Sequence, residues 1–225
     1  MKKLTSILII SAIIIGSSAF LHSKFSKTVG RHNDASYSDF SADTKDWQLI
    51  LVNSQNPIPE NYNIELTTLS NGVNVDSRIY PDLQNMFDDA RNSGIYPIVG
   101  EGYRTKKDQE NIMNEKILEF ILQGYSKTEA RELAKEWVAE PGTSEHELGI
   151  ALDINADTEL SADEDVYQWL SENAYKYGFI LRYPYGKEAV TGIDYEPWHY
   201  RYVGKEAASA IFSQQITLEE YCSAN

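Results

Sequence analysis

The segment from Ser144 to Asp153 reads Ser-Glu-His-Glu-Leu-Gly-Ile-Ala-Leu-Asp, and the interpretation of the whole chain starts from it. Its second half predicts a strand over residues 150–154, because aliphatic residues alternate there with small or polar ones. Asp153 then lies on the face opposite the aliphatic side chains, where a carboxylate without a partner is costly to bury. A metal ion would compensate its charge. His146 precedes the strand, and Gly149 would let the chain turn tightly between the two residues.

A second segment, residues 195–203, reads Tyr-Glu-Pro-Trp-His-Tyr-Arg-Tyr-Val and is predicted as another strand. Pro197 disfavours helical geometry at the residue before it, so Glu196 is expected to be extended and to lie at the strand's entrance. Alternation places His199 and Arg201 on the face opposite the aromatic side chains. Glu196 can then reach over the site that His199 occupies.

These two segments contain the only histidines after residue 46, His146 and His199. A single histidine is more often a satisfied core residue than a ligand. Two imidazoles together with Asp153, however, form a first shell typical of catalytic zinc, with one position open for water. Glu196, a carboxylate outside this shell, suits a general base that takes a proton from the water and gives it to a leaving amine.

The rest of the chain predicts helices that alternate with short strands, which favours one α+β domain over residues 47–225. Capping boxes that begin at Thr105 and Ser126 predict the starts of two helices, the second ending before Pro141. Two other helices are expected over residues 81–92 and 163–177, and a last helix is expected to begin at residue 205. The other expected strands cover residues 47–52, 96–99 and 179–183.

The N-terminus indicates where the protein acts. Residues 1–21 combine a basic start with an apolar run, as in a signal peptide or a membrane-anchor helix, and residues 22–46 are expected to be a flexible linker. Everything after the apolar run would lie outside the cytoplasm, either anchored to the membrane or secreted. His22 and His32 lie in or beside this linker without metal-binding neighbours and receive no function.

Composition excludes some classes of function. Asp and Glu number 34 and Lys and Arg 20, which gives a formal net charge of −14. Such an acidic chain repels phosphate backbones, so nucleic acid is not expected as a partner. The single cysteine, Cys222, can form neither an intramolecular disulfide nor a cysteine-cluster metal site.

Together these residues resemble the VanY and LdcB group of D-alanyl-D-alanine carboxypeptidases, whose pattern is S-x-H-x-x-G-x-A-x-D followed by E-x-W-H. The matching residues here are Ser144, His146, Gly149, Ala151, Asp153, Glu196, Trp198 and His199. The resemblance includes the Gly-Tyr-Arg-Thr element at residues 102–105 and Gln109, and it extends from residue 51 to residue 204.

The resemblance implies a zinc-peptidase domain with a small, mostly antiparallel sheet flanked by helices. It makes His146, Asp153 and His199 the ligands of one zinc ion per chain and Glu196 the catalytic base. It also implies that Arg104 stabilises the oxyanion of the tetrahedral intermediate.

Ser144 and Gln109 would hold the substrate's terminal residue. Three simpler interpretations stay open: Arg104 as a partner of nearby carboxylates, Ser144 as a turn or cap residue, and Gln109 as a solvent-facing residue. Glu145 and Glu147, which flank a ligand, are expected to be solvated.

The function that follows from the resemblance is removal of the C-terminal D-alanine from peptidoglycan stem peptides by a monomeric enzyme. L,D-carboxypeptidase action on tetrapeptide stems is an alternative, because it would use the same metal site. D-Ala-D-Ala dipeptidase action is less favoured, since free dipeptide arises in the cytoplasm. A non-catalytic zinc module that binds the cell wall would not need Glu196, and a scaffold domain without metal would be distinguished by metal analysis of the purified protein.

Overall fold

The computed structural model describes residues 45–224, which fall within one compact unit. The predicted signal or anchor segment, residues 1–21, and the linker as far as residue 44 lie outside the described residues. Among residues 45–224, no helix has the length and apolar character needed to cross a bilayer.

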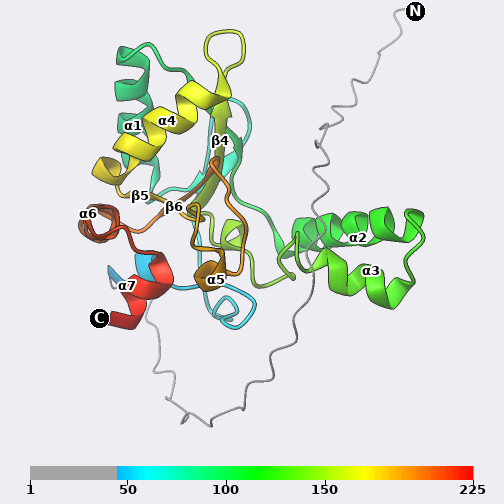
Figure 1. The fold of residues 1–225 in the computed structure, drawn as a ribbon. Coiled ribbons are helices and arrows are strands. Elements are labelled where there is room, and N and C mark those ends of the chain that lie inside the picture. Colours follow the sequence, from blue (N-terminus) through cyan, green and yellow to red (C-terminus); the bar gives the residue numbers. More distant parts are fainter. Residues whose placement is uncertain (1–44, 225) are drawn as a thin grey trace, which may run out of the picture. The chain divides into compact units, whose positions relative to one another are not determined.

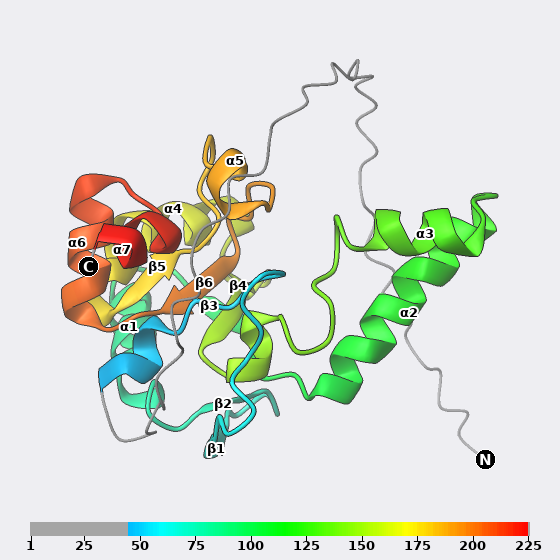
Figure 2. The same cartoon turned by 90° about the horizontal axis from the view of Figure 1, so that it is seen from below.

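The centre of the domain is a four-stranded antiparallel sheet in the order β3-β4-β6-β5, whose strands are all labelled in the second of two views (Figures 1 and 2). Its strands are β3 (Pro97–Glu101), β4 (Ala151–Ala156), β6 (His199–Tyr202) and β5 (Phe179–Leu181). A separate two-stranded antiparallel sheet is formed by β1 (Leu66–Thr68) and β2 (Asn74–Asp76). The α+β class and the small antiparallel sheet expected from the sequence are therefore confirmed.

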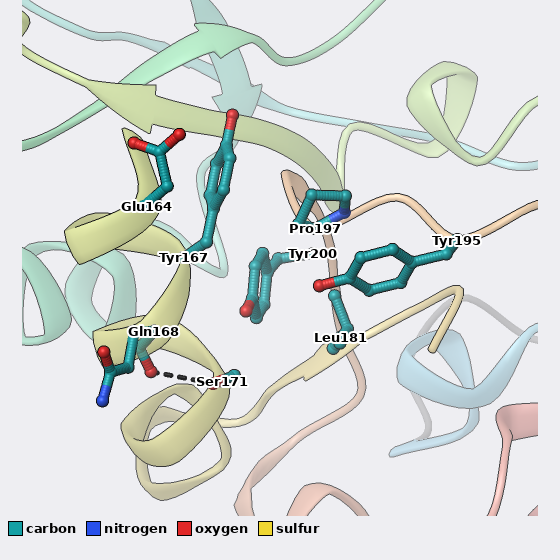
Figure 3. Close-up of a pocket in the computed structure, with 8 residues that line it drawn as sticks. All are labelled: Glu164, Tyr167, Gln168, Ser171, Leu181, Tyr195, Pro197 and Tyr200. Carbon is teal, nitrogen blue, oxygen red and sulfur yellow. Dashed lines mark hydrogen bonds between the residues drawn. The ribbon is translucent and has the colours of Figure 1, made fainter. Parts of the chain in front are cut away.

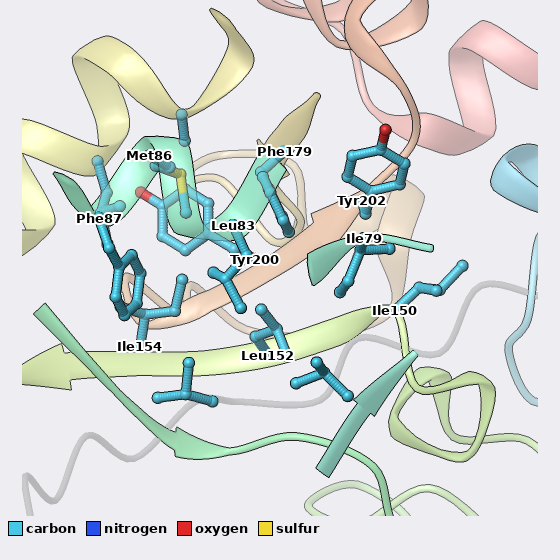
Figure 4. Close-up of a cluster of buried hydrophobic side chains, with 14 of the residues drawn as sticks. Ile79, Leu83, Met86, Phe87, Ile150, Leu152, Ile154, Phe179, Tyr200 and Tyr202 are labelled. Carbon is cyan, nitrogen blue, oxygen red and sulfur yellow. The ribbon is translucent and has the colours of Figure 1, made fainter. Parts of the chain in front are cut away.

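One face of the sheet carries the main hydrophobic core, under α1 (Tyr80–Asn92) and α4 (Asp163–Asn173). Figure 4 shows the side chains of β4 and β6 that face these helices. The core includes Leu83, Met86, Phe87, Leu152, Ile154, Val166, Leu170, Phe179, Tyr200 and Tyr202. Because side chains alternate along each strand, the residues between them, Asp153 and His199 included, lie on the opposite face.

A second, smaller core lies where α6 (Lys205–Gln214) and α7 (Leu218–Ala224) pack near β5. The short α5 (Glu188–Thr191) contacts α7. Helices α2 (Lys106–Leu122) and α3 (Lys127–Ala134) run beside each other and extend away from the sheet (Figures 1 and 2). Both begin with the capping boxes expected from the sequence, at Thr105 and Ser126.

Short 3-10 helices complete the domain: η1 (Lys45–Leu49), η2 (Glu145–Leu148) and η3 (Ala174–Tyr177). The last of these takes the final turn of the helix predicted for residues 163–177. Helix α3 ends before Pro141, as the sequence predicts, and already at Ala134, where the backbone changes to tighter turns, such as the one in which the Trp137 N–H donates to the Ala134 carbonyl.

The strand predicted for residues 47–52 was also wrong. This stretch forms η1 and irregular chain, and the backbone carbonyls of Gln48 and Ile50 accept hydrogen bonds from the Arg201 guanidinium, at 3.1 and 2.9 Å. A buried side chain thus satisfies carbonyl groups that a neighbouring strand would otherwise pair with.

Candidate metal and catalytic site

The register between β4 and β6 brings two of the expected ligands together, because Asp153 lies directly across from His199. Asp153 Oδ1 lies 3.2 Å from His199 Nδ1 and 3.4 Å from His146 Nε2. One ligand atom from each of the three residues can be chosen so that all lie within 4.8 Å of one another. The sheet therefore places three distant parts of the sequence around one point.

His146 is held at this point by two glycines. Gly149 ends η2 with a φ of 71°, and a Cβ there would lie 2.3 Å from Ile64 Cδ1. Gly102 supplies the carbonyl oxygen that lies 2.8 Å from His146 Nδ1. A Cβ on Gly102 would lie 2.4 Å from the Asn74 carbonyl oxygen. With Nδ1 engaged, His146 presents Nε2 to the site.

The electrostatics of this group suit a cation. Burial would raise the pKa of Asp153, but the adjacent His146 and His199 outweigh it and hold that pKa well below its ordinary value. Burial would likewise lower the pKa of His199, but Asp153 and Glu145 outweigh it and raise that pKa to about 9. Asp153 Oδ1 is buried and has no hydrogen-bond partner among residues 45–224. Two nitrogens and a carboxylate with an unpartnered oxygen fit a zinc ion that keeps one position open.

Glu196 lies beside these ligands rather than among them. The predicted strand over residues 195–203 is shorter than expected, because β6 begins at His199 and the His199 N–H contacts the Glu196 carbonyl in a turn. This turn brings Glu196 Oε2 to 3.5 Å from His199 Nδ1. The side chain is 29% exposed, and its burial raises the pKa of the carboxyl group. A carboxylate near the ligands with a raised pKa is suited to proton transfer.

Arg104 lies at the edge of the site, where its Nη2 is 3.9 Å from Asp153 Oδ2. Glu101 at the end of β3 fixes the guanidinium through a two-fold ion pair, and Arg104 Nη1 donates to Gln109 Oε1 at 3.1 Å. Gln109 is buried, and its Nε2 donates to the Ala139 carbonyl at 2.8 Å. The interpretation of Gln109 as solvent-facing was therefore wrong.

Ser144 is buried immediately before η2, and its side chain does not cap that helix. The structure therefore gives no support to its interpretation as a simple cap residue.

The prediction that Glu145 and Glu147 are solvated was wrong. Glu145 is 3% exposed and Glu147 is 9% exposed. Glu147 accepts a hydrogen bond from the Gly142 N–H at 2.8 Å. Glu145 pairs with Arg182 and Arg201. The available signal was Arg201 itself, since an arginine on an inward-facing strand position requires a buried partner.

A cavity of about 380 Å³ lies beside the catalytic candidate (Figure 3). Tyr195 and Pro197, the two neighbours of Glu196 in sequence, contribute to its wall, and α4 forms another part. Tyr167 of α4 lines the cavity and donates a hydrogen bond to Asn155 Oδ1, two residues along β4 from Asp153. Tyr200 also lines the cavity, and neither the metal-ligand candidates nor Glu196 is among its lining residues, so the cavity is distinct from the metal site.

The fold and the site define a class: an α+β domain in which two histidines and an aspartate could hold one metal ion, with a glutamate carboxylate 3.5 Å from one of the histidines. Comparison with known proteins agrees. The family model for VanY, D-alanyl-D-alanine carboxypeptidase, matches residues 72–205. A D-alanyl-D-alanine carboxypeptidase of Enterococcus faecalis is 56% identical over 179 residues, which are 80% of this chain and 67% of that protein.

Solved structures agree as well. A mutant of the vancomycin resistance D,D-pentapeptidase VanY in complex with Zn(II) superposes with a TM-score of 0.75 at 56% identity, covering 78% of this chain and 99% of that one. The LD-carboxypeptidase LdcB superposes with a TM-score of 0.66 at 36% identity, covering 77% and 84%. The chain belongs to the VanY family of D-alanyl-D-alanine carboxypeptidases. The family recognised from the sequence is confirmed.

Proposed function

We propose that this protein is a zinc-dependent D,D-carboxypeptidase that removes the C-terminal D-alanine from peptidoglycan stem peptides. The observation that carries the proposal is the group formed by His146, Asp153 and His199, whose ligand atoms lie within 4.8 Å of one another. Glu196 lies next to this group and outside it, as a general base requires. The VanY-type relatives support the same activity.

Zinc, when bound by these three residues, supplies Lewis acidity that polarises the scissile carbonyl and lowers the pKa of a water molecule to roughly 7. The proton transfers are carried out by a side chain of the protein. Glu196 accepts the proton of the attacking water at its carboxylate and gives it to the departing amine of D-alanine. Its partial burial favours this role, because the raised pKa makes the carboxylate a better base at neutral pH.

Arg104 Nη2 lies 3.9 Å from Asp153 Oδ2 and pairs with Glu101, which supports a role beside the metal site. We propose that it meets the negative charge that develops on the carbonyl oxygen. Ser144 is proposed to contact the terminal carboxylate of the substrate. Gln109 has both ends of its carboxamide engaged by protein groups, so its proposed role narrows to orienting Arg104 toward the substrate.

An L,D-carboxypeptidase acting on tetrapeptide stems is the second candidate. The structural similarity to LdcB favours it, at 36% identity. The higher identity to the VanY structure, 56%, favours the D,D-activity. A non-catalytic zinc module is less favoured, because such a module would not need a carboxylate at Glu196 beside the ligands.

The substrate lies outside the cytoplasm, so we propose that the enzyme acts in the cell envelope. Residues 1–21 would direct export and, if they stay attached, would anchor the chain to the membrane. We also propose that the enzyme acts as a monomer, which light scattering of residues 45–225 would test by showing the mass of one chain.

The experiment that tests the function uses defined tetrapeptide and pentapeptide stems, each incubated with the protein in the presence and absence of a chelator. Mass analysis identifies the amino acid released. The proposal expects D-alanine from the pentapeptide only, and no release after chelation. Release from the tetrapeptide alone would establish the second candidate, and release that resists chelation would exclude a zinc enzyme.

A further inference from the structure

Three buried charged residues and one half-buried one pack behind the metal ligands, and we refer to them as the buried charge cluster: Glu145, Arg182, Arg201 and the half-buried Glu219. Their side chains are 1%, 1%, 0% and 14% exposed, respectively. Two carboxylates and two guanidinium groups balance in formal charge. The cluster lies on the same sheet face as the site, because Arg201 and His199 are two residues apart on β6.

The two arginines contact three of the four carboxylate oxygens of the cluster, and only Glu145 Oε2 is not contacted. Glu145 Oε1 lies 2.9 Å from Arg182 Nε and 3.1 Å from Arg201 Nη1. Arg182 gives its other nitrogens to the Glu219 carboxylate, at 2.6 and 3.0 Å. Arg201 gives its other nitrogens to backbone carbonyls, including its neighbour's at 3.0 Å. Glu145 Oε2 is left with no hydrogen-bond partner among the described residues.

That free oxygen faces the metal site. Glu145 Oε2 lies 3.9 Å from His199 Nε2, and His199 Nε2 is likewise buried without a hydrogen-bond partner among residues 45–224. The other nitrogen of the same ring, Nδ1, faces Asp153. His146 shows the matching arrangement, with one ring nitrogen toward Asp153 and the other 2.8 Å from the Gly102 carbonyl.

We propose that Glu145 is a positioning residue for His199. Its Oε2 accepts a hydrogen bond from His199 Nε2–H, which directs the lone pair of Nδ1 toward the metal. Arg182 and Arg201 fix the opposite oxygen, so the carboxylate cannot turn away from the ring. An outer hydrogen bond of this kind sets the tautomer and orientation of a metal-bound imidazole. The inference rests on the metal assignment in the proposed function.

A purely structural role of Glu145 would differ from the positioning role in one respect. If Glu145 served only to neutralise the two arginines, an acceptor on the arginine side would be sufficient, and the chemistry of the atom facing His199 would not matter. Glu145→Gln separates the two roles. Its carboxamide oxygen can still face the arginines, but its NH₂ group then meets the His199 Nε2–H, donor against donor.

The matched control is Glu219→Gln, which removes a charge from the same cluster at Arg182 without touching His199. Zinc affinity is measured for the parent and both variants by competition with a chelating dye, alongside urea unfolding of each metal-free protein. We expect both variants to lose stability. Only Glu145→Gln is expected to bind zinc about 10- to 100-fold more weakly, the usual effect of losing an outer-shell partner.

Equal zinc affinities in the parent and Glu145→Gln, or equal losses in both variants, would overturn the inference. If the parent protein did not bind zinc, the proposed function itself would be refuted. Histidine ¹⁵N NMR of the zinc-loaded parent gives a second reading that needs no variant. We expect a slowly exchanging proton on His199 Nε2, and a proton on Nδ1 instead would refute the positioning role.

Discussion

Replacing Glu196 with glutamine removes the proposed base and leaves its surroundings intact. The side chain is 29% exposed and has one short contact with a ligand, 3.5 Å to His199 Nδ1. The backbone contacts that shape the turn, from the Glu196 N–H to the Tyr183 carbonyl and from the His199 N–H to the Glu196 carbonyl, do not depend on the charge. We therefore expect Glu196→Gln to fold and to bind zinc.

The expected loss is catalytic. Proton transfer by a positioned side chain contributes about 10²- to 10⁴-fold to a rate. Because burial raises the pKa of Glu196 and so strengthens it as a base, we expect the upper half of that range. A loss of about 10³- to 10⁴-fold in kcat corresponds to roughly 4–5.5 kcal/mol of activation free energy.

The assay follows D-alanine release from a pentapeptide stem by mass analysis, with zinc content measured on the same samples. Glu206→Gln is the matched control, since Glu206 is exposed on α6 and takes no part in the site. It should keep the activity of the parent. If Glu196→Gln hydrolysed the pentapeptide at the parental rate while carrying zinc, the assignment of the base would be refuted.

Three further predictions concern the oxyanion partner, the turn between the ligands and alkaline stability. Arg104→Ala should lower kcat by about 100- to 1,000-fold with zinc content unchanged, as steady-state kinetics and metal analysis would show; an unchanged kcat would leave Arg104 as a partner of Glu101 alone. Gly149→Ala should lower the free energy of unfolding by about 1–3 kcal/mol in urea titrations, because position 149 has a positive φ; an unchanged midpoint would contradict this. Burial, aided by the hydrogen bond to Asp89, raises the pKa of the Tyr177 phenol to about 12. The folded protein therefore favours the protonated phenol, and this stabilisation is complete below a pH of about 10 and is lost as the pH rises toward 12. Between those values, stability should fall less steeply in Tyr177→Phe than in the parent; identical slopes in urea titrations across that range would exclude the effect.

The parts of the fold that the sequence predicted are those with strong local patterns. The capping boxes at Thr105 and Ser126 gave the starts of α2 and α3, and the alternation around Asp153 gave β4. The ligand group was also predictable, because its members lie in segments whose residue types are unusual for a core. The structure brings His146, Asp153 and His199 together as expected.

Two of the errors, the strand predicted for residues 47–52 and the solvated Glu145, share one cause, which is the long-range contact of buried arginines. Arg201 donates hydrogen bonds to the backbone carbonyl groups of Gln48 and Ile50, which lie in a segment that the local sequence predicts to be a strand. It also joins Arg182 in burying Glu145, a residue that local sequence had suggested was solvated. The partners lie 37 or more positions apart along the chain, so no window of neighbouring residues contains the information.

The central claim is that three side chains bind one zinc ion, and a crystal structure of the zinc-loaded protein with anomalous scattering at the zinc edge tests it most directly. The account predicts one strong peak per chain, about 2.0–2.2 Å from His146 Nε2, an oxygen of Asp153 and His199 Nδ1. A peak elsewhere, or full zinc content in a protein with His146→Ala and His199→Ala combined, would contradict it.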